Sequence, residues 1–210
     1  MCCRYYMELS PELRPYVEAA ERSPLTEKLV AALARPLTAK GEVRPTNLVP
    51  VIAPSRDRRA AVYPMVWGFT GPTSPLVNAR SETAKVKPTF RESWQKRRCA
   101  IPASWYYEWE HFRSEDGRTR TGEKYAIQPA GAKLMFLAGL YRLEEQNGLT
   151  VPVFTVLTKE PAGELRRIHD RMPVILPRSA VGKWIDPGAR AEDCMQLALT
   201  DLIAEPCIIK

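Results

Sequence analysis

The first third of the chain has two helix-start signals. Ser10 with Pro11, and then Ser23 with Pro24, combine a residue that caps helix N-termini with one that fits the first helical turn. Apolar residues recur at helical spacing after each signal, the second time as far as about Leu33. The pattern therefore predicts two consecutive helices.

Most of the remaining chain consists of short apolar runs bounded by proline, glycine and polar residues, which are typical of strands. We expect strands at residues 48–54, 61–69, 99–110, 124–129, 134–144 and 151–159, and a last strand at the C-terminus. Short helices are expected at residues 89–98, 161–168, 179–184 and 190–199. The polar segment 113–123 predicts a flexible hairpin tip.

Strands and helices do not alternate regularly, which argues against a parallel βαβ architecture. The order of elements predicts an α+β fold with a mainly antiparallel, barrel-like sheet and flanking helices. No segment has the composition of a linker, so we expect a single domain over residues 1–210.

Composition indicates a folded protein with a polyanionic partner. The chain is 45% hydrophobic and carries a net charge of +7. It shows no secretory signal and no apolar run long enough to cross a bilayer, so we expect a cytoplasmic monomer with no membrane partner and mostly reduced cysteines. Its five cysteines and two histidines lack zinc-site spacing, so neither a metal nor a cofactor is expected.

Positive charge is concentrated in residues 85–98, "KVKPTFRESWQKRR", which hold six basic residues, one acid and two aromatic residues. This run has two interpretations. It is either the solvated face of a helix or a nucleic-acid contact in which the aromatic rings, Phe90 and Trp94, lie among the cations.

Two ionisable residues lie in apolar surroundings. Glu108 belongs to the segment "WYYEWE", where strand alternation places it on one face with Tyr106 and Glu110. It either faces solvent or lies against apolar walls that raise its pKa toward the range useful for acid–base catalysis. His169, between a short helix and an apolar strand, is either structural or a proton-transfer group.

The segment "NARSET" places Asn78, Arg80 and Glu82 on one face if it is extended. Arg80 has the geometry to bind a phosphate, and Asn78 to hold a hydroxyl or carbonyl group. The alternative is an internal salt bridge between Arg80 and Glu82.

The chain starts with "MCCR", which is either a disordered end or a reactive one. If Met1 is removed, Cys2 carries a free α-amine and a thiol on adjacent carbons. The α-amine has a reference pKa of about 7.7–8.0, so a useful fraction is neutral near pH 7.

Together these segments resemble the SOS-response-associated peptidase (SRAP) family of abasic-site processing proteins. The matching pieces, in family order over nearly the whole chain, are "MCCR", "EVRPTNLVPVI", "WGF", "NARSET", "RRCAIPASWYYEW", "FTVLT" and "IHDRMPVIL". One departure is Cys3, which replaces the usual family glycine.

The resemblance implies a single α+β domain that binds single-stranded DNA containing an abasic site. It assigns the catalytic roles to Cys2, Asn78, Glu108 and His169. It places phosphate contacts at Arg4 and Arg80 and a base contact at Trp67, and the basic run adds Lys85, Lys87, Arg97 and Arg98.

The implied reaction joins Cys2 to the ring-opened abasic sugar through a thiazolidine ring, which needs an amine and a thiol on neighbouring carbons. His169 would open the sugar ring, Asn78 would position it, and Glu108 would shuttle protons. AP-lyase and autopeptidase activities are implied as side reactions. Two alternatives stay open: a thiol peptidase or amidohydrolase with Cys2 as nucleophile, and a non-catalytic single-stranded DNA-binding module.

Overall fold

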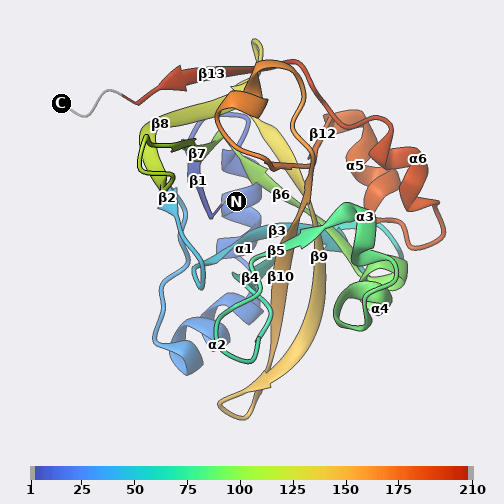
Figure 1. Ribbon diagram of the computed structural model, residues 1–210. Helices are drawn as coiled ribbons and strands as arrows, with labels where there is room; N and C mark the ends of the chain where they lie inside the picture. The colour runs from blue at the N-terminus through green and yellow to red at the C-terminus, as the bar shows by residue number, and fades with distance from the viewer. Residues whose placement is uncertain (1–2, 208–210) are drawn as a thin grey trace.

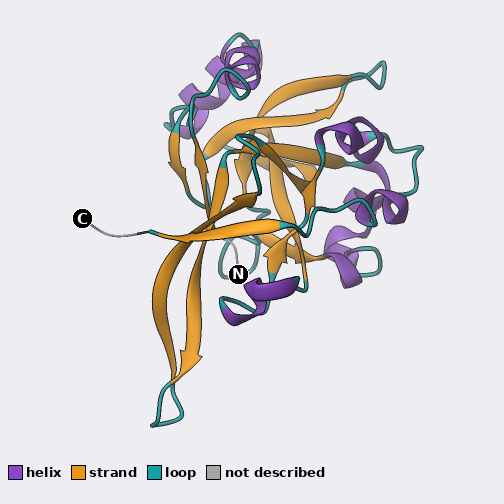
Figure 2. Ribbon diagram, turned by 90° about the horizontal axis from the view of Figure 1, so that it is seen from above, coloured by secondary structure: helices purple, strands orange, loops and turns teal. Residues whose placement is uncertain are grey.

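The computed structural model describes residues 3–207 and arranges them as two β-sheets with helices packed around them (Figures 1 and 2). Both sheets are mainly antiparallel; the parallel pairings are those of β10 with β4 and with β5. The α+β class is confirmed.

Five strands of the larger sheet close into a barrel. They are β3 (Leu48–Pro54), β4 (Ala60–Trp67), β6 (Arg98–Ala103), β9 (Met135–Gln146) and β10 (Leu149–Lys159). The ring closes because β10 pairs with β9 on one side and with β4 on the other. Gly139 lets β9 lie close to Ile101 of β6 and to the backbone of β10. A Cβ atom at this position would lie 2.7 Å from Ile101 and 2.9 Å from the carbonyl oxygen of Thr155. The predicted barrel is confirmed.

Three short strands extend the larger sheet. They are β5 (Asn78–Arg80), β11 (Met172–Pro173) and β12 (Ile175–Leu176). β5 runs parallel to β10, and β11 pairs with the end of β10, so the segments "NARSET" and "IHDRMP" meet beside the same strand.

The second sheet has the order β13–β8–β7–β1–β2. Its strands are β1 (Arg4–Met7), β2 (Gly41–Val43), β7 (Trp105–Arg113), β8 (Thr119–Pro129) and β13 (Leu202–Pro206). Residues 113–123, predicted as a hairpin tip, are largely paired, because β7 and β8 extend as a long hairpin away from the barrel (Figure 2).

The single strand predicted at residues 99–110 is two strands in different sheets, β6 and β7. The chain turns at Ser104, whose N–H donates to the carbonyl of Tyr6 and whose hydroxyl accepts from the N–H of Glu8. Contacts with β1, nearly a hundred positions earlier, thus determine this corner.

The helices lie around the barrel (Figure 1). They are α1 (Arg14–Glu21), α2 (Pro24–Leu33), α3 (Ser81–Ala84), α4 (Pro88–Lys96), α5 (Arg178–Ile185), α6 (Ala191–Met195) and a 3-10 turn, Gly163–Arg167. Ser23 caps α2 as predicted, but α1 begins at Arg14 because Ser10 closes a preceding turn. The helix predicted at 190–199 is shorter, as is the one at 161–168.

Two apolar clusters hold the elements together. One joins inward-facing residues of the barrel, such as Trp67 and Phe154, to Tyr5 and Tyr106 of the second sheet. The other fills the space between the outside of the barrel and the helices. The second sheet is therefore fixed to the barrel through the face that carries Tyr5. No helix among residues 3–207 is long and apolar enough to span a bilayer.

Arg98, predicted to bind DNA, is a buried structural residue, so this part of the prediction is wrong. It is 3% exposed. Its guanidinium donates to the carbonyl oxygens of Trp94, Trp184, Asp186 and Ala189. These contacts tie the chain after α5 to the start of β6.

Arg98→Leu should lower the free energy of unfolding by about 2–4 kcal/mol, because buried carbonyl groups lose their donor. The neighbouring Arg97 is half-exposed and pairs with Glu92 at 3.4 Å, so Arg97→Leu should change stability by about 0.5 kcal/mol or less. Urea denaturation of both variants checks this. Equal effects would show that the carbonyl contacts of Arg98 do not stabilise the fold.

Candidate functional site

The pairing of β1 with β7 brings the start of the described chain beside Glu108. Arg4 lies opposite Tyr107, and Tyr5 opposite Tyr106. Tyr5 is fully buried and packs on Trp67, with ring centroids 5.3 Å apart, which anchors β1 in the core. Cys2 lies outside the described residues; Cys3 is half-buried and free of disulfides.

Glu108 is buried, so its solvent-facing interpretation is wrong. It is 3% exposed, and its Oε1 accepts from the N–H of Trp109 at 3.3 Å. Burial raises the pKa of its carboxyl group, and the negative charge of Asp170 raises it further. Glu108 is therefore more readily protonated near neutrality than an exposed glutamate, as suits an acid–base group.

His169 and the residue before it, Ile168, contact His111 of β7. Its ring centroid is 4.9 Å from that of His111, and the N–H of His111 donates to the carbonyl of Ile168. Asp170, the residue after His169, acts electrostatically on Glu108. These contacts bring the "IHDR" segment and Glu108 into one site.

Burial lowers the pKa of His169 to about 4, although Asp170 opposes the shift. Its Nδ1 atom is 3.0 Å from the backbone nitrogen of Arg171 and 2.7 Å from Oδ1 of Asp170. Nδ1 cannot accept from the first and donate to the second at once. Because the neutral ring is favoured, we assign Nδ1 as acceptor of the Arg171 N–H and place the proton on Nε2.

Glu82 forms an ion pair with Arg171, and not with Arg80 as the alternative interpretation of the sequence had it. Two hydrogen bonds of 2.8 and 2.9 Å join the guanidinium and carboxylate groups. Partial burial would raise the pKa of Glu82, but the hydrogen bonds from Arg171 outweigh it and the pKa is lowered. Arg171 also donates to the carbonyl of Thr158, so it fixes the loop that carries His169.

The segment "NARSET" lies beside β10 at the same end of the barrel. Asn78 is opposite Val156 and Arg80 is opposite Thr158. Arg80 is exposed, and it borders a cavity of about 370 Å³ lined by Arg80, Glu160, Pro161, Arg166, Asp170 and Arg171. The cavity thus places guanidinium groups, which can bind phosphate in a bidentate manner, next to the residue that follows His169.

Trp67, predicted to contact DNA bases, is fully buried, so direct contact with bases does not fit the structure. Its Nε1 donates to the carbonyl of Val77 at 3.0 Å, and its ring lies parallel to Phe154. Gly68 follows with φ of +118°, and a Cβ there would lie 2.7 Å from Pro75. The Trp-Gly element thus closes the loop that leads to Asn78.

The rest of the basic run is accessible. Lys85 and Lys87 are exposed between α3 and α4, and Arg97 is half-exposed at the end of α4. The structure brings together Glu108, His169 and the "NARSET" strand, while these three cations lie on the helical side of the barrel.

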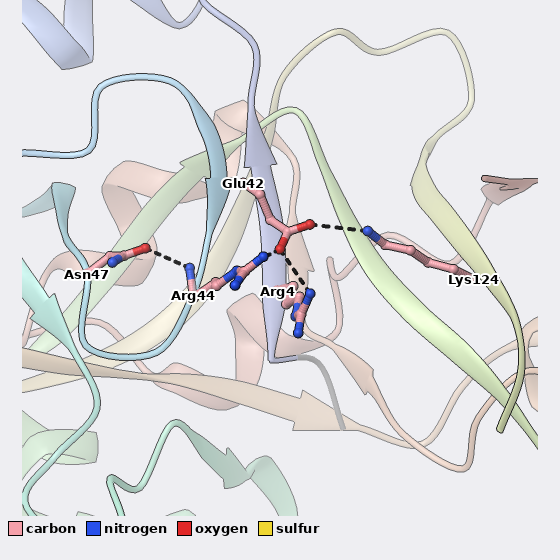
Figure 3. A network of polar contacts seen from close by, with 5 residues as sticks. All are labelled: Arg4, Glu42, Arg44, Asn47 and Lys124. Atoms are coloured by element: carbon pink, nitrogen blue, oxygen red, sulfur yellow. Dashed lines mark hydrogen bonds and ion pairs between the residues drawn. The ribbon is translucent and has the colours of Figure 1, made fainter. Parts of the chain in front are cut away.

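A polar network that sequence reasoning missed surrounds Arg4 (Figure 3). Glu42 of β2 pairs with Arg4 at 3.0 Å, Arg44 at 2.8 Å and Lys124 at 3.1 Å. The side-chain oxygen of Asn47 accepts from the Arg44 backbone N–H. Glu42 lies some forty residues from Arg4 and eighty from Lys124, so no local pattern signals this contact.

No cluster of His, Cys, Asp and Glu suited to a metal ion occurs among residues 3–207.

The sequence pattern of the SOS response associated peptidase (SRAP) family matches residues 1–206. This match covers nearly the whole chain, including every segment that forms the site. The chain therefore belongs to the SOS response associated peptidase (SRAP) family.

Relatives share about a quarter to a third of their residues with the chain. The abasic site processing protein YoaM of Bacillus subtilis is 30% identical over 175 residues, which cover 76% of this chain and 74% of YoaM. YobE of the same species is 32% identical over 141 residues, covering 63% of this chain and 62% of YobE. YedK of Escherichia coli is 25% identical over 151 residues, covering 70% of this chain and 65% of YedK. The chain thus spans less than two thirds of YobE and of YedK.

Solved structures share the fold. A protein of Bacteroides thetaiotaomicron superimposes with a TM-score of 0.72 at 21% identity, covering 98% of this chain and 91% of its own. A protein of Bordetella bronchiseptica gives a TM-score of 0.65 at 24% identity, covering 99% and 100%.

His169 should remain neutral down to about pH 4, well below the usual histidine pKa of about 6.5. An NMR titration of the imidazole protons checks this, because the chain has two histidines and His111→Gln assigns the signals. A midpoint for His169 near 6.5 would contradict its burial.

The same shift predicts how stability depends on pH. The folded-state pKa is depressed, so below pH 6.5 the unfolded chain binds the extra proton, and stability is lost as pH falls from about 6.5 to 4. His169→Gln should remove this contribution. The stability difference between wild type and variant should therefore rise with pH across that window, and a flat difference would contradict the shift.

Proposed function

We propose that the chain is an abasic-site processing protein that binds single-stranded DNA and links Cys2 covalently to the ring-opened abasic sugar. The observation that carries the proposal is the position of β1 between β2 and β7, which brings the start of the described chain beside Glu108. The relatives YoaM, YobE and YedK are each named abasic site processing protein, which supports the processing of abasic sites.

In the proposed reaction, removal of Met1 frees the α-amine of Cys2. The amine attacks the C1 aldehyde of the open sugar and loses water to give an imine. The thiol sulfur then adds to the imine carbon, and its proton passes to the imine nitrogen, which closes the thiazolidine ring. Amine and thiol must lie on adjacent carbons for this ring to form, and only an N-terminal cysteine supplies both.

Two buried groups would handle the protons. His169, neutral at pH 7, acts as the base that opens the sugar hemiacetal, and its pKa is low because it is buried. Glu108 has a raised pKa and gives or takes protons at the amine during imine formation and ring closure. Asn78 holds the sugar or its phosphate from β5.

The cations would bind the DNA backbone. Arg80 borders the cavity next to Asp170, and Arg4 lies on β1 beside Tyr107. Lys85, Lys87 and Arg97 add positive charge near α4. The imine also permits β-elimination of the 3′ phosphate, which would give AP-lyase activity, and removal of Met1 would be the autopeptidase activity.

Incubation with single-stranded DNA that carries an abasic site should give a covalent band on a denaturing gel. Cys2→Ser should abolish it, whereas the matched variant Cys3→Ser should keep it, because Cys3 has no free α-amine. Intact-mass spectrometry should show a protein without Met1. A band that survives Cys2→Ser would place the link elsewhere, and no band with correctly processed protein, together with hydrolysis of peptides, would favour a thiol peptidase.

Glu108→Gln and His169→Gln should slow adduct formation by about 10²- to 10⁴-fold, the usual contribution of acid–base catalysis. Single-turnover rates at saturating DNA measure this. Unchanged rates would assign both residues to structural roles.

Affinity for single-stranded DNA should fall as the salt concentration rises. Each phosphate contact contributes about 0.7 to the slope of log affinity against log salt concentration, so the double variant Lys85→Gln, Lys87→Gln should reduce that slope by about 1.4. The matched control is Lys28→Gln, an exposed lysine on α2. Fluorescence anisotropy measures both. Identical slopes in all three proteins would exclude Lys85 and Lys87 from the DNA interface.

A further inference from the structure

The outer face of the second sheet carries a row of aromatic residues that the reaction does not use. In antiparallel sheets, residues that lie directly opposite each other share a face. Tyr6 lies opposite Trp105, and β7 places Tyr107 and Trp109 on the same side as Trp105. We call Tyr6, Trp105, Tyr107 and Trp109 the aromatic strip. The other face of these strands carries Tyr5, Tyr106 and Glu108, which point into the core.

The rings of the strip form an ordered array. Tyr6 and Trp105 are stacked with centroids 4.4 Å apart and an angle of 4° between their planes. Tyr107 stands edge-on to both at 6.4 Å. Tyr6, Trp105 and Trp109 are partly exposed, so solvent reaches this array.

Cations lie over and beside the strip. The ammonium group of Lys124 is 3.6 Å from the centre of the Tyr107 ring, and the Arg4 guanidinium is 5.2 Å from that of Trp109. Glu42 holds both cations together with Arg44, as Figure 3 shows. The network has three positive charges and one negative charge, so this face favours an anionic ligand.

We propose that the aromatic strip is a stacking subsite for the bases of single-stranded DNA that flank the lesion. Flat rings with cations beside them are the two elements that bind single-stranded nucleic acid without reading its sequence. The phosphates would contact Arg4, Arg44 and Lys124, while neighbouring bases stack on the pair formed by Tyr6 and Trp105.

The position of the strip fits a strand that continues from the proposed reaction site. Arg4 lies on the face of the strip, opposite Tyr107, and Tyr107 is the chain neighbour of Glu108, so the strip and the proposed reaction site meet at this end of β1. Tyr6 follows on the same face, about 7 Å further along β1. This inference rests on the proposed function for the direction of the strand, while binding of bases to the strip is measurable on undamaged DNA.

The tryptophans of the chain allow a direct test. Trp67, Trp94 and Trp184 are buried, so quenching of tryptophan emission by added thymidine oligonucleotide reports on Trp105 and Trp109. We expect quenching in the wild-type protein and loss of most of it in Trp105→Leu. Absence of quenching at oligonucleotide concentrations that saturate the anisotropy signal would overturn the proposal, as would binding of the strip to a protein partner instead of DNA.

Affinity gives the second measurement. Stacking on one aromatic residue changes affinity for single-stranded DNA by about 5- to 150-fold, so Trp105→Leu and Tyr6→Leu should each weaken binding of the oligonucleotide within that range. The matched control is Phe112→Leu, which alters a ring that is 46% exposed near the far end of β7, and it should bind like wild type. Unchanged affinity in Trp105→Leu and Tyr6→Leu variants that fold would overturn the proposal. If neither variant folds, the quenching experiment on the wild-type protein decides whether DNA bases contact the strip.

The covalent assay separates this inference from the proposed function. With DNA that carries an abasic site at saturating concentration, the wild type and the control variant Phe112→Leu should reach the same adduct yield. Adduct formation without quenching would contradict the stacking role of the strip and leave the proposed reaction standing. Quenching without any adduct would contradict the proposed reaction and leave the strip as a binding site for undamaged single strands.

Discussion

The site depends on one short antiparallel pairing, that of β1 with β7. β1 has four residues, and its inward side chains, Tyr5 and Met7, are fully buried. Burial of large apolar side chains contributes about 1.5–3 kcal/mol each, so two of them can fix the position of a strand this short. The register then determines which side chains lie near the start of the chain. A shift of β1 by one residue would exchange its buried and exposed faces, and a different residue of β7 would then lie beside the start of the described chain.

Burial shifts the pKa values of Glu108 and His169 toward their neutral forms. The raised pKa of Glu108 favours its protonated form, and the lowered pKa of His169 favours its unprotonated form. A carboxyl group with a raised pKa and an imidazole with a lowered pKa are the kind of pair that proteins use for proton transfer. The charged pairs lie around them instead: Arg171 pairs with Glu82, and Arg4 and Lys124 pair with Glu42.

Sequence patterns predicted the elements better than their contacts. Periodicity gave α2, most strands and the α+β class, and the segments around Glu108, His169 and Asn78 were recognisable because polar groups interrupt apolar runs. The corner at Ser104 was not predictable, since its partners are on β1. Arg97 and Arg98 are neighbours in the same basic run and look alike in the sequence. Arg98 is buried because its guanidinium group binds carbonyl groups near the end of α5, and these lie far away along the chain. Trp67 was misassigned for the same reason, because its burial depends on Phe154 and Tyr5.

The separation of β1 from its partner along the chain has a consequence for synthesis. Arg4 pairs with Tyr107, and Tyr6 with Trp105, so about a hundred residues must be translated before β1 can pair with β7. At about 5–20 residues per second this interval is on the order of 5–20 s. During that time β1 can pair with β2, which is translated well before β7. The topology thus orders events in time: the pair of β1 and β2 can form first, and Glu108 comes beside the start of the described chain only when β7 follows.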